Sequence, residues 1–178
     1  MVRLFAAIEV PPDVARDLRP RMTGVPDARW RPDEALHVTL RFYGEVAENT
    51  ADDLCVELAR IQGRPFELVL DGVGAFGDPH QSQAIWAGVA DSEPLRTLAA
   101  RCDAAGVRAG LPKETRRYKP HVTLAYLRHA DQARVAGWLA NHGRLQSPPF
   151  RVTWFGLYSS VLHPSGSRYE LEREFALQ

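Results

Sequence analysis

The feature that most constrains this chain is an internal repeat. The tetrapeptide His-Val-Thr-Leu occurs at residues 37–40 and again at residues 121–124, 84 residues later. The segments Phe66-Glu67-Leu68-Val69-Leu70 and Phe150-Arg151-Val152-Thr153-Trp154 are also 84 residues apart. One shared tetrapeptide can arise by chance, but two features in one register indicate two copies of a structural unit.

The order of predicted elements is the same in both copies. Short β-branched and aromatic runs bounded by Gly and Pro predict strands, and apolar spacing after capping residues predicts helices. In the first copy we predict strands at Arg3 to Val10, Leu36 to Tyr43 and Phe66 to Phe76, with helices at Pro12 to Met22 and Thr50 to Ile61. In the second copy we predict strands at Gln83 to Ala90, His121 to Leu127 and Phe150 to Ser159, helices at Ser92 to Val107 and Asp131 to Asn141, and a closing strand at Tyr169 to Leu177.

This repeat predicts an α+β fold with two lobes related by a pseudo-twofold axis. Each lobe is expected to hold an antiparallel-rich sheet with helices on its outer side, so that the two His-Val-Thr-Leu motifs face each other across a central cleft. The length of 178 residues and the lack of a long linker favour a single bilobal domain over 1–178, with copies at about 1–80 and 81–178.

Charge and composition narrow the partners and the location. Twenty-two basic and 22 acidic side chains give zero net charge, so the chain lacks the global positive field that tight binding of long nucleic acids requires. Cys55 and Cys102 lie in helix-like patterns, which favours a reducing compartment. The first apolar stretch, Leu4 to Ile8, is too short for a signal peptide or a membrane span. We therefore expect a cytoplasmic monomer with no membrane contact and no obligatory protein partner.

The two repeated motifs carry the groups needed for acid/base chemistry. Because side chains alternate along a strand, His37 and Thr39 share one face, and His121 and Thr123 share the equivalent face. Two imidazoles and two hydroxyls around one space could supply a base, an acid and donors for phosphoryl oxygens. Either motif alone could be a pair of polar strand residues, but the repetition favours a functional pair.

Residues around the motifs extend the candidate site. Arg116, Arg117, Tyr118 and Lys119 precede His121 in an irregular segment, which suits phosphate contact and base stacking but also a solvated loop. Alternation places Tyr43 on the face of His37. Alternation turns Phe42 toward the core, and it turns Tyr126 away from the histidine unless a bulge intervenes.

A zinc site is the main rival use of two histidines. The sequence contains neither a His-x-x-x-His pattern on a helix nor a Cys-x-x-Cys pattern, which are the common signatures of such sites. Two histidines with an unidentified third ligand stay open as an alternative.

The paired motifs resemble the His-x-Thr motifs of the 2H phosphoesterase superfamily. Leu4-Phe5-Ala6-Ala7-Ile8, the segment His37 to Gly44, and Lys119-Pro120-His121-Val122-Thr123-Leu124-Ala125 are similar to segments of the bacterial and archaeal RNA 2',3'-cyclic phosphodiesterases, also called 2'-5' RNA ligases. The resemblance spans essentially the whole chain. It implies a bilobal fold, no obligatory metal or other cofactor, and hydrolysis of RNA 2',3'-cyclic phosphate ends to 2'-phosphomonoesters.

The resemblance also implies residue roles. His37 would donate a proton to the leaving 3' oxygen, His121 would accept the proton of the attacking water, and the two threonines would hydrogen-bond the non-bridging oxygens. Similar sequences often carry a basic residue where this chain has Tyr126. The cation that faces the phosphate would then come from Arg41, Arg116, Arg117 or Lys119. We predict Thr39, Thr123, Arg41, Tyr43, Arg117 and Lys119 as substrate-binding residues.

Three alternatives remain at this level. A 2H enzyme could act on another phosphodiester, such as a 2',5'-linked oligonucleotide, or catalyse reversible 2'-5' ligation of RNA. A protein of a different class, an RNA-end binding module, could use the same histidines only to recognise phosphate.

Overall fold

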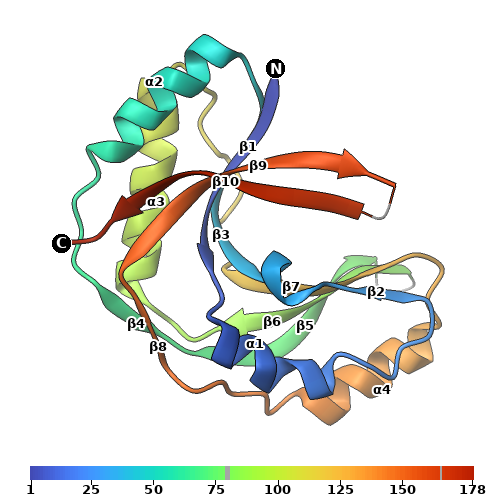
Figure 1. The fold of residues 1–178 in the computed structure, drawn as a ribbon. Coiled ribbons are helices and arrows are strands. Elements are labelled where there is room, and N and C mark those ends of the chain that lie inside the picture. Colours follow the sequence, from blue (N-terminus) through green and yellow to red (C-terminus); the bar gives the residue numbers. More distant parts are fainter. Residues whose placement is uncertain (79–80, 165) are drawn as a thin grey trace.

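The computed structural model describes residues 1–78, 81–164 and 166–178. The α+β class is confirmed, and every predicted helix and strand is present (Figure 1). The short strand Ala28–Trp30 was not predicted, and the strands predicted at Phe66 to Phe76 and Phe150 to Ser159 are each divided in two. The strands are β1 (Val2–Glu9), β2 (Ala28–Trp30), β3 (His37–Val46), β4 (Phe66–Leu68), β5 (Leu70–Asp78), β6 (Gln81–Val89), β7 (His121–Leu127), β8 (Phe150–Val152), β9 (Trp154–His163) and β10 (Gly166–Ala176). The helices are α1 (Pro12–Leu18), α2 (Glu48–Ala59), α3 (Glu93–Arg108) and α4 (Gln132–His142), with 3-10 turns at Arg19–Arg21 and Asp33–Ala35.

Helix starts follow the capping residues that the sequence offers. The Ser92 side chain accepts a hydrogen bond from the Leu95 amide at the start of α3, and the Asp131 side chain accepts one from the Ala133 amide at the start of α4. The first helix is shorter than predicted, because α1 ends at Leu18 and a 3-10 turn with Pro20 continues it. No helix among the described residues is long and apolar enough to cross a membrane.

One antiparallel sheet runs through the molecule in the order β10-β9-β1-β3-β7-β6-β5, and β2 adds to it by pairing with β7. A separate two-stranded sheet joins β4 to β8. In Figure 1 the β9–β10 and β5–β6 hairpins project to the same side of the molecule. The two motif strands, β3 and β7, are neighbours at the centre of the large sheet.

Strand pairing locates the pseudo-twofold axis of the repeat. Val38 of β3 pairs with Val122 of β7, and these two residues are 84 positions apart. Glu67 of β4 pairs with Arg151 of β8 at the same spacing. A residue can lie opposite its own repeat equivalent in an antiparallel pair only where a local twofold axis passes between them. The axis therefore passes through both pairs, and the motif histidines flank it.

The two copies exchange strands, which differs from the expectation that each copy folds into its own lobe. β5 of the first copy pairs with β6 of the second, and β9 of the second pairs with β1 of the first. The reason lies in the connection between the copies, because β5 ends at Asp78 and β6 begins at Gln81. Such a short connection between strands favours an antiparallel hairpin, and the twofold relation places β9 equivalently.

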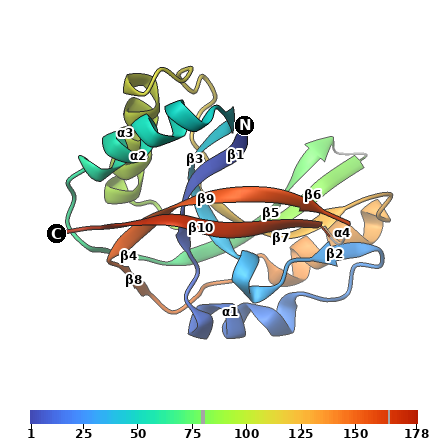
Figure 2. The ribbon, with the colours of Figure 1, turned by 45° about the horizontal axis from the view of Figure 1, so that its top comes forward.

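The helices cover the sheet from its outer sides. α2 and α3 contact each other and α3 packs on β3, whereas α4 contacts β5 and β6. The indole of Trp138 on α4 donates a hydrogen bond to the Arg21 carbonyl, 2.9 Å away, which ties α4 to the segment after α1. Figures 1 and 2 show α2 with α3 at one end of the molecule and α1 with α4 at the other. Each group therefore contains one helix from each copy.

The two faces of the motif strands differ in burial. The aliphatic residues of both motifs, Val38, Leu40, Val122 and Leu124, belong to the main core beneath the helices. The other face carries His37, Thr39, His121 and Thr123, and we call it the histidine face. Its four motif side chains are half-buried.

Candidate active site

Both motif strands contain a β-bulge at the leucine of the motif. On β3 the pairing with β1 passes from Arg41 directly to Thr39, so Leu40 is the extra residue. On β7 the pairing with β6 skips Leu124 in the same way. A bulge places two consecutive residues opposite one and so reverses the alternation of faces beyond it. The strict alternation assumed from the sequence therefore fails after each motif.

Each histidine is oriented by the backbone just before it. The Nδ1 atom of His37 lies 2.8 Å from the Ala35 carbonyl oxygen, and the Nδ1 atom of His121 lies 2.7 Å from the Lys119 carbonyl oxygen. A carbonyl oxygen only accepts, so Nδ1 is the protonated nitrogen in each neutral ring. The Nε2 atom is then the basic nitrogen, and no described residue forms a hydrogen bond with it in either ring.

His37 sits among aromatic rings. The ring of Phe5 is 5.0 Å away between centroids, and the ring of Tyr169 is 5.1 Å away in an edge-on arrangement. Desolvation by this burial lowers the pKa of His37 from 6.5 to about 4, the hydrogen bond to the Ala35 carbonyl opposes the shift, and the charges of Arg31 and His121 add to it. His37 is therefore neutral at pH 7 in the unliganded protein.

His121 has a related environment on the other side of the axis. The ring of Phe76 lies edge-on at 4.7 Å between centroids, and the indole of Trp86 lies at 6.2 Å. Burial lowers the pKa of His121, the hydrogen bond to the Lys119 carbonyl opposes the shift, and the Lys119 charge lowers the pKa further. In the part of the chain that the structure describes, Nε2 of His121 has no hydrogen-bond partner, and a neutral imidazole in this state is suited to accept a proton.

The two threonines lie on the histidine face as predicted. Because Val38 pairs with Val122 in an antiparallel arrangement, continuing the register places His37 beside Thr123 and Thr39 beside His121. Within the described parts of the chain, no hydrogen bond to another side chain occupies either threonine hydroxyl. The structure thus brings the four motif side chains together around the axis.

Arg41 does not lie where the sequence predicted. Beyond the bulge its position is opposite Ala6, a residue of the main core, so it leaves the histidine face. Its guanidinium donates to Asp103 at 2.8 Å and to Glu114 at 3.3 Å, and to the Pro112 carbonyl at 2.7 Å. These partners hold the guanidinium against α3 and the 110–120 segment, which contradicts a role in substrate binding.

Tyr43 also lies away from the histidine face. Its side chain is buried against α3, and its hydroxyl donates a hydrogen bond of 2.9 Å to the Cys102 carbonyl. Burial raises the pKa of this phenol well above its usual value. Phe42 was predicted to face the core, but it pairs with Phe5 and points to the histidine face. The predictions for both residues were wrong because they assumed a strand without bulges.

The segment before His121 contributes part of what was expected. The Lys119 ammonium lies 4.7 Å from the Trp86 ring and 5.3 Å from the Phe76 ring, beside His121. Arg117 is exposed. The charge of Arg116 is paired with Glu114 at 2.9 Å, and the Tyr118 hydroxyl donates to the Thr39 carbonyl at 2.9 Å. Lys119 thus lies at the site, whereas the role of Arg117 stays a prediction.

Sequence reasoning missed Arg31, which follows β2. Its side chain is 8% exposed and lies over the rings of Tyr126 and Tyr169. Beyond the bulge at Leu124, Tyr126 pairs with Ala84 and shares the histidine face. The sequence signal for Arg31 is weak, because β2 has only three residues and pairs with a strand almost 100 positions away.

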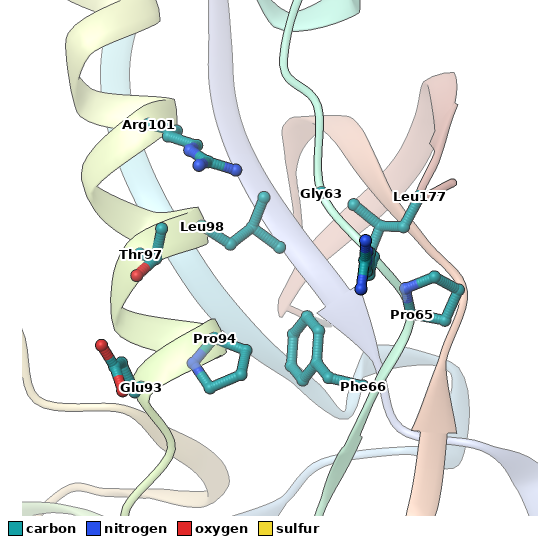
Figure 3. A pocket seen from close by; sticks show the side chains of 10 residues that line it. Gly63, Pro65, Phe66, Glu93, Pro94, Thr97, Leu98, Arg101 and Leu177 are labelled. Atoms are coloured by element: carbon teal, nitrogen blue, oxygen red, sulfur yellow. The ribbon is translucent and has the colours of Figure 1, made fainter.

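One small pocket belongs to this site, and a larger cavity lies elsewhere. His37 lines the small pocket together with Phe5, Glu9, Glu34, Tyr158 and Tyr169. A larger cavity of about 310 Å³ lies between the start of α3 and the C-terminal residues, lined by Phe66, Leu98, Arg101 and Leu177 among others (Figure 3). Within residues 1–78, 81–164 and 166–178, no three His, Cys, Asp or Glu side chains are grouped as metal ligands.

Comparison with known proteins places this geometry in a family. A family model described as the 2'-5' RNA ligase superfamily matches residues 8–163. The chain belongs to the 2'-5' RNA ligase superfamily. Members of this superfamily are 2H phosphoesterases, so the resemblance drawn from the motifs is confirmed. This membership supports phosphoesterase activity for the chain.

Individual relatives match over almost the whole length. The protein is similar to an RNA 2',3'-cyclic phosphodiesterase of Escherichia coli, with 31% identity over 98% of this chain and 96% of the relative. A protein of the same name from Archaeoglobus fulgidus is 28% identical over 98% of this chain and 99% of the relative. The crystal structure of E. coli LigT complexed with 3'-AMP has a TM-score of 0.80 at 26% identity, covering 99% of this chain and 98% of that one. TT0787 of Thermus thermophilus has a TM-score of 0.80 at 27% identity over 98% and 97% of the two chains.

Proposed function

We propose that this protein hydrolyses RNA 2',3'-cyclic phosphate ends to 2'-phosphomonoesters without a metal ion, using His37 and His121 for the two proton transfers. The supporting observation is that the two histidine rings have equivalent hydrogen bonds. Each has Nδ1 held by the carbonyl two residues earlier and Nε2 left for a bound molecule, on either side of the twofold axis. The names of the relatives are consistent with this substrate.

The proposed reaction is an in-line displacement at phosphorus. The Nε2 atom of His121 takes a proton from a water molecule as the water oxygen forms a bond to phosphorus. The bond between phosphorus and the 3' oxygen breaks, and the Nε2 atom of protonated His37 gives its proton to that oxygen. The products are a 3'-hydroxyl and a 2'-phosphomonoester, and the proton returns from His121 to His37 through solvent.

The proposed mechanism needs one protonated histidine, and the negative charge of the substrate favours that protonation. Both histidines have lowered pKa values in the unliganded site, which suits His121 as the base but leaves His37 neutral at pH 7. A bound phosphodiester brings a negative charge next to His37, and an opposite charge raises a histidine pKa. Binding of the substrate therefore promotes protonation of its own general acid.

The remaining contacts follow from the positions of the neighbouring groups. Thr39 and Thr123 donate their hydroxyl hydrogens to the non-bridging oxygens, where negative charge builds up in the transition state. Lys119 and the exposed Arg117 attract the backbone of the RNA end. The indole of Trp86, half-buried beside Lys119, offers a surface for a base.

The first experiment measures turnover of a short RNA that ends in a 2',3'-cyclic phosphate, with a chelator present. We expect His37→Ala and His121→Ala each to lower kcat about 10²- to 10⁴-fold, the usual contribution of a general acid or base. His142→Ala serves as the matched control, because this histidine lies on α4 and its Nδ1 atom also bonds a carbonyl, that of Trp138. Equal activity in all variants would reject the proposal.

A modified substrate separates the acid from the base. Replacing the bridging 3' oxygen by sulfur gives a leaving group that departs without protonation. Such a substrate should restore turnover in His37→Ala and not in His121→Ala. The opposite pattern would exchange the two roles while keeping the pair.

Two further outcomes point to the alternatives. Hydrolysis of a 2',5'-linked oligonucleotide in preference to the cyclic phosphate would keep the chemistry and change the substrate. Binding of the RNA end with no turnover by the wild type would indicate a binding module. The cytoplasmic location and monomeric state expected from the sequence stay predictions.

A further inference from the structure

Arg31 combines burial, aromatic contacts and a position beside the motif residues. Its guanidinium carbon lies 5.3 Å from the Tyr126 ring centroid and 5.5 Å from the Tyr169 ring centroid. Two aromatic rings that contact one guanidinium restrict its orientation and stabilise its charge. With only 8% of its surface exposed, Arg31 is the most enclosed basic group at the histidine face.

Among the described residues, no carboxylate forms an ion pair with the Arg31 guanidinium. Its hydrogen-bond partners are neutral: the Ser167 carbonyl at 3.2 Å and the Tyr169 hydroxyl. Arg41 shows the contrasting case, since Asp103 and Glu114 both contact its guanidinium. A buried cation without an anionic partner is costly, so a site of this kind gains free energy when an anion binds.

The location of Arg31 indicates which anion it would meet. The Tyr169 ring contacts both the Arg31 guanidinium and the His37 ring. The Arg31 backbone amide donates to the Leu124 carbonyl at 2.8 Å, directly after Thr123. Arg31 thus lies beside the half of the site formed by His37 and Thr123, and its charge contributes to the lowered pKa of His37.

We propose that Arg31 binds the non-bridging oxygens of the substrate phosphate from the side of His37 and Thr123. This assignment deepens the proposed function and rests on it for the identity of the substrate. Arg31 supplies the cation that was expected from Arg41, Arg116, Arg117 or Lys119. The Tyr126 ring packs against its guanidinium. Because the guanidinium is held in place before binding, little side-chain entropy is lost when the phosphate arrives.

The test uses the full chain and inorganic phosphate as the probe, since phosphate binding does not depend on turnover. NMR shifts of the histidine ring protons at pH 7 report the Kd. We expect Arg31→Met to raise the phosphate Kd about 10- to 100-fold, the range for loss of a charge-assisted contact, and Arg31→Lys to raise it less. Arg144→Met, which removes an exposed arginine after α4, should leave the Kd unchanged.

A rescue variant distinguishes phosphate binding from packing. The Arg31 guanidinium lies over the Tyr126 ring, so Tyr126→Arg in the Arg31→Met background returns a guanidinium to this part of the histidine face. We expect the double variant to recover most of the phosphate affinity. Circular dichroism confirms that each variant is folded, and Arg31→Gln replaces Arg31→Met if the methionine variant does not fold.

The outcomes separate this proposal from the proposed function. A folded variant without Arg31 that binds phosphate as tightly as the wild type would overturn the assignment, even if the wild type hydrolyses cyclic phosphate. If phosphate affinity falls as expected but the wild type has no cyclic phosphodiesterase activity, Arg31 remains the anion ligand and the proposed reaction fails. With both correct, Arg31→Met also raises the KM for the cyclic phosphate.

Discussion

The tautomer of each motif histidine depends on a hydrogen bond to the carbonyl two residues before it. The bonds from His37 to the Ala35 carbonyl and from His121 to the Lys119 carbonyl are local, so the sequence around each motif specifies them. The shifts in pKa are different in origin. They come mainly from burial by rings on other strands, such as Phe5 beside His37 and Phe76 beside His121.

These shifts predict how stability depends on pH. The pKa of His37 is about 4 in the folded protein and 6.5 when unfolded. As pH falls from 6.5 to about 4, the unfolded chain takes up a proton that the folded protein does not, so the free energy of unfolding decreases. His37→Asn should lose less stability than the wild type between pH 7 and pH 5, measured by urea unfolding at both values. An equal loss in the two proteins would contradict the low pKa of His37.

At the scale of elements, the bulge at Leu40 decides which residues reach the site. It removes Arg41 and Tyr43 from the histidine face and brings Phe42 to it. A bulge is a feature of two paired strands, and neither strand alone reveals it. The equivalent bulge at Leu124 gives Tyr126 the same placement, so the repeat preserved the irregularity together with the motif.

The displaced Arg41 should be a structural residue. Its side chain is 10% exposed and that of its partner Asp103 is 18% exposed. Arg41→Met leaves Asp103 without its cation and Glu114 with Arg116 alone, and we expect a loss of about 2–3 kcal/mol in the free energy of unfolding, less than for a fully buried pair. Chemical denaturation measures this loss. Arg60→Met, whose pair with Glu57 is on the surface, should change stability by only about 0.5 kcal/mol.

Kinetics distinguish this role from substrate binding. If Arg41 contacted the phosphate, its loss would raise KM without a matching loss of stability. A stable Arg41→Met protein with a greatly raised KM would return Arg41 to the substrate site.

At the scale of the whole molecule, the two copies depend on each other. β1 has a partner from the other copy in β9, and β6 has one in β5. α2 and α3, which pack together, also come from different copies. The site itself lies between the copies, because β3 and β7 each supply one histidine. The exchange of strands makes the spacing of these histidines a property of the entire fold.

This interdependence predicts the behaviour of a divided chain. Fragments 1–80 and 81–178 should each lack a cooperative unfolding transition, since each loses central strand partners and half of its helix packing. Mixing them should restore the transition and the circular dichroism spectrum of the intact protein. A fragment that unfolds cooperatively by itself would show that one copy is an independent folding unit.

The sequence by itself determined the repeat, the order of the helices and of the longer strands, the pairing of the two motifs and the membership of the family. Each of these depends on patterns within short segments or on the fixed spacing of 84 residues between them. The tertiary structure decided three other matters: the exchange of β5 and β9, the bulges that redirect Arg41 and Tyr43, and the position of Arg31 beside His37. These depend on hydrogen bonds and packing between strands far apart in the chain, whose register no local pattern specifies.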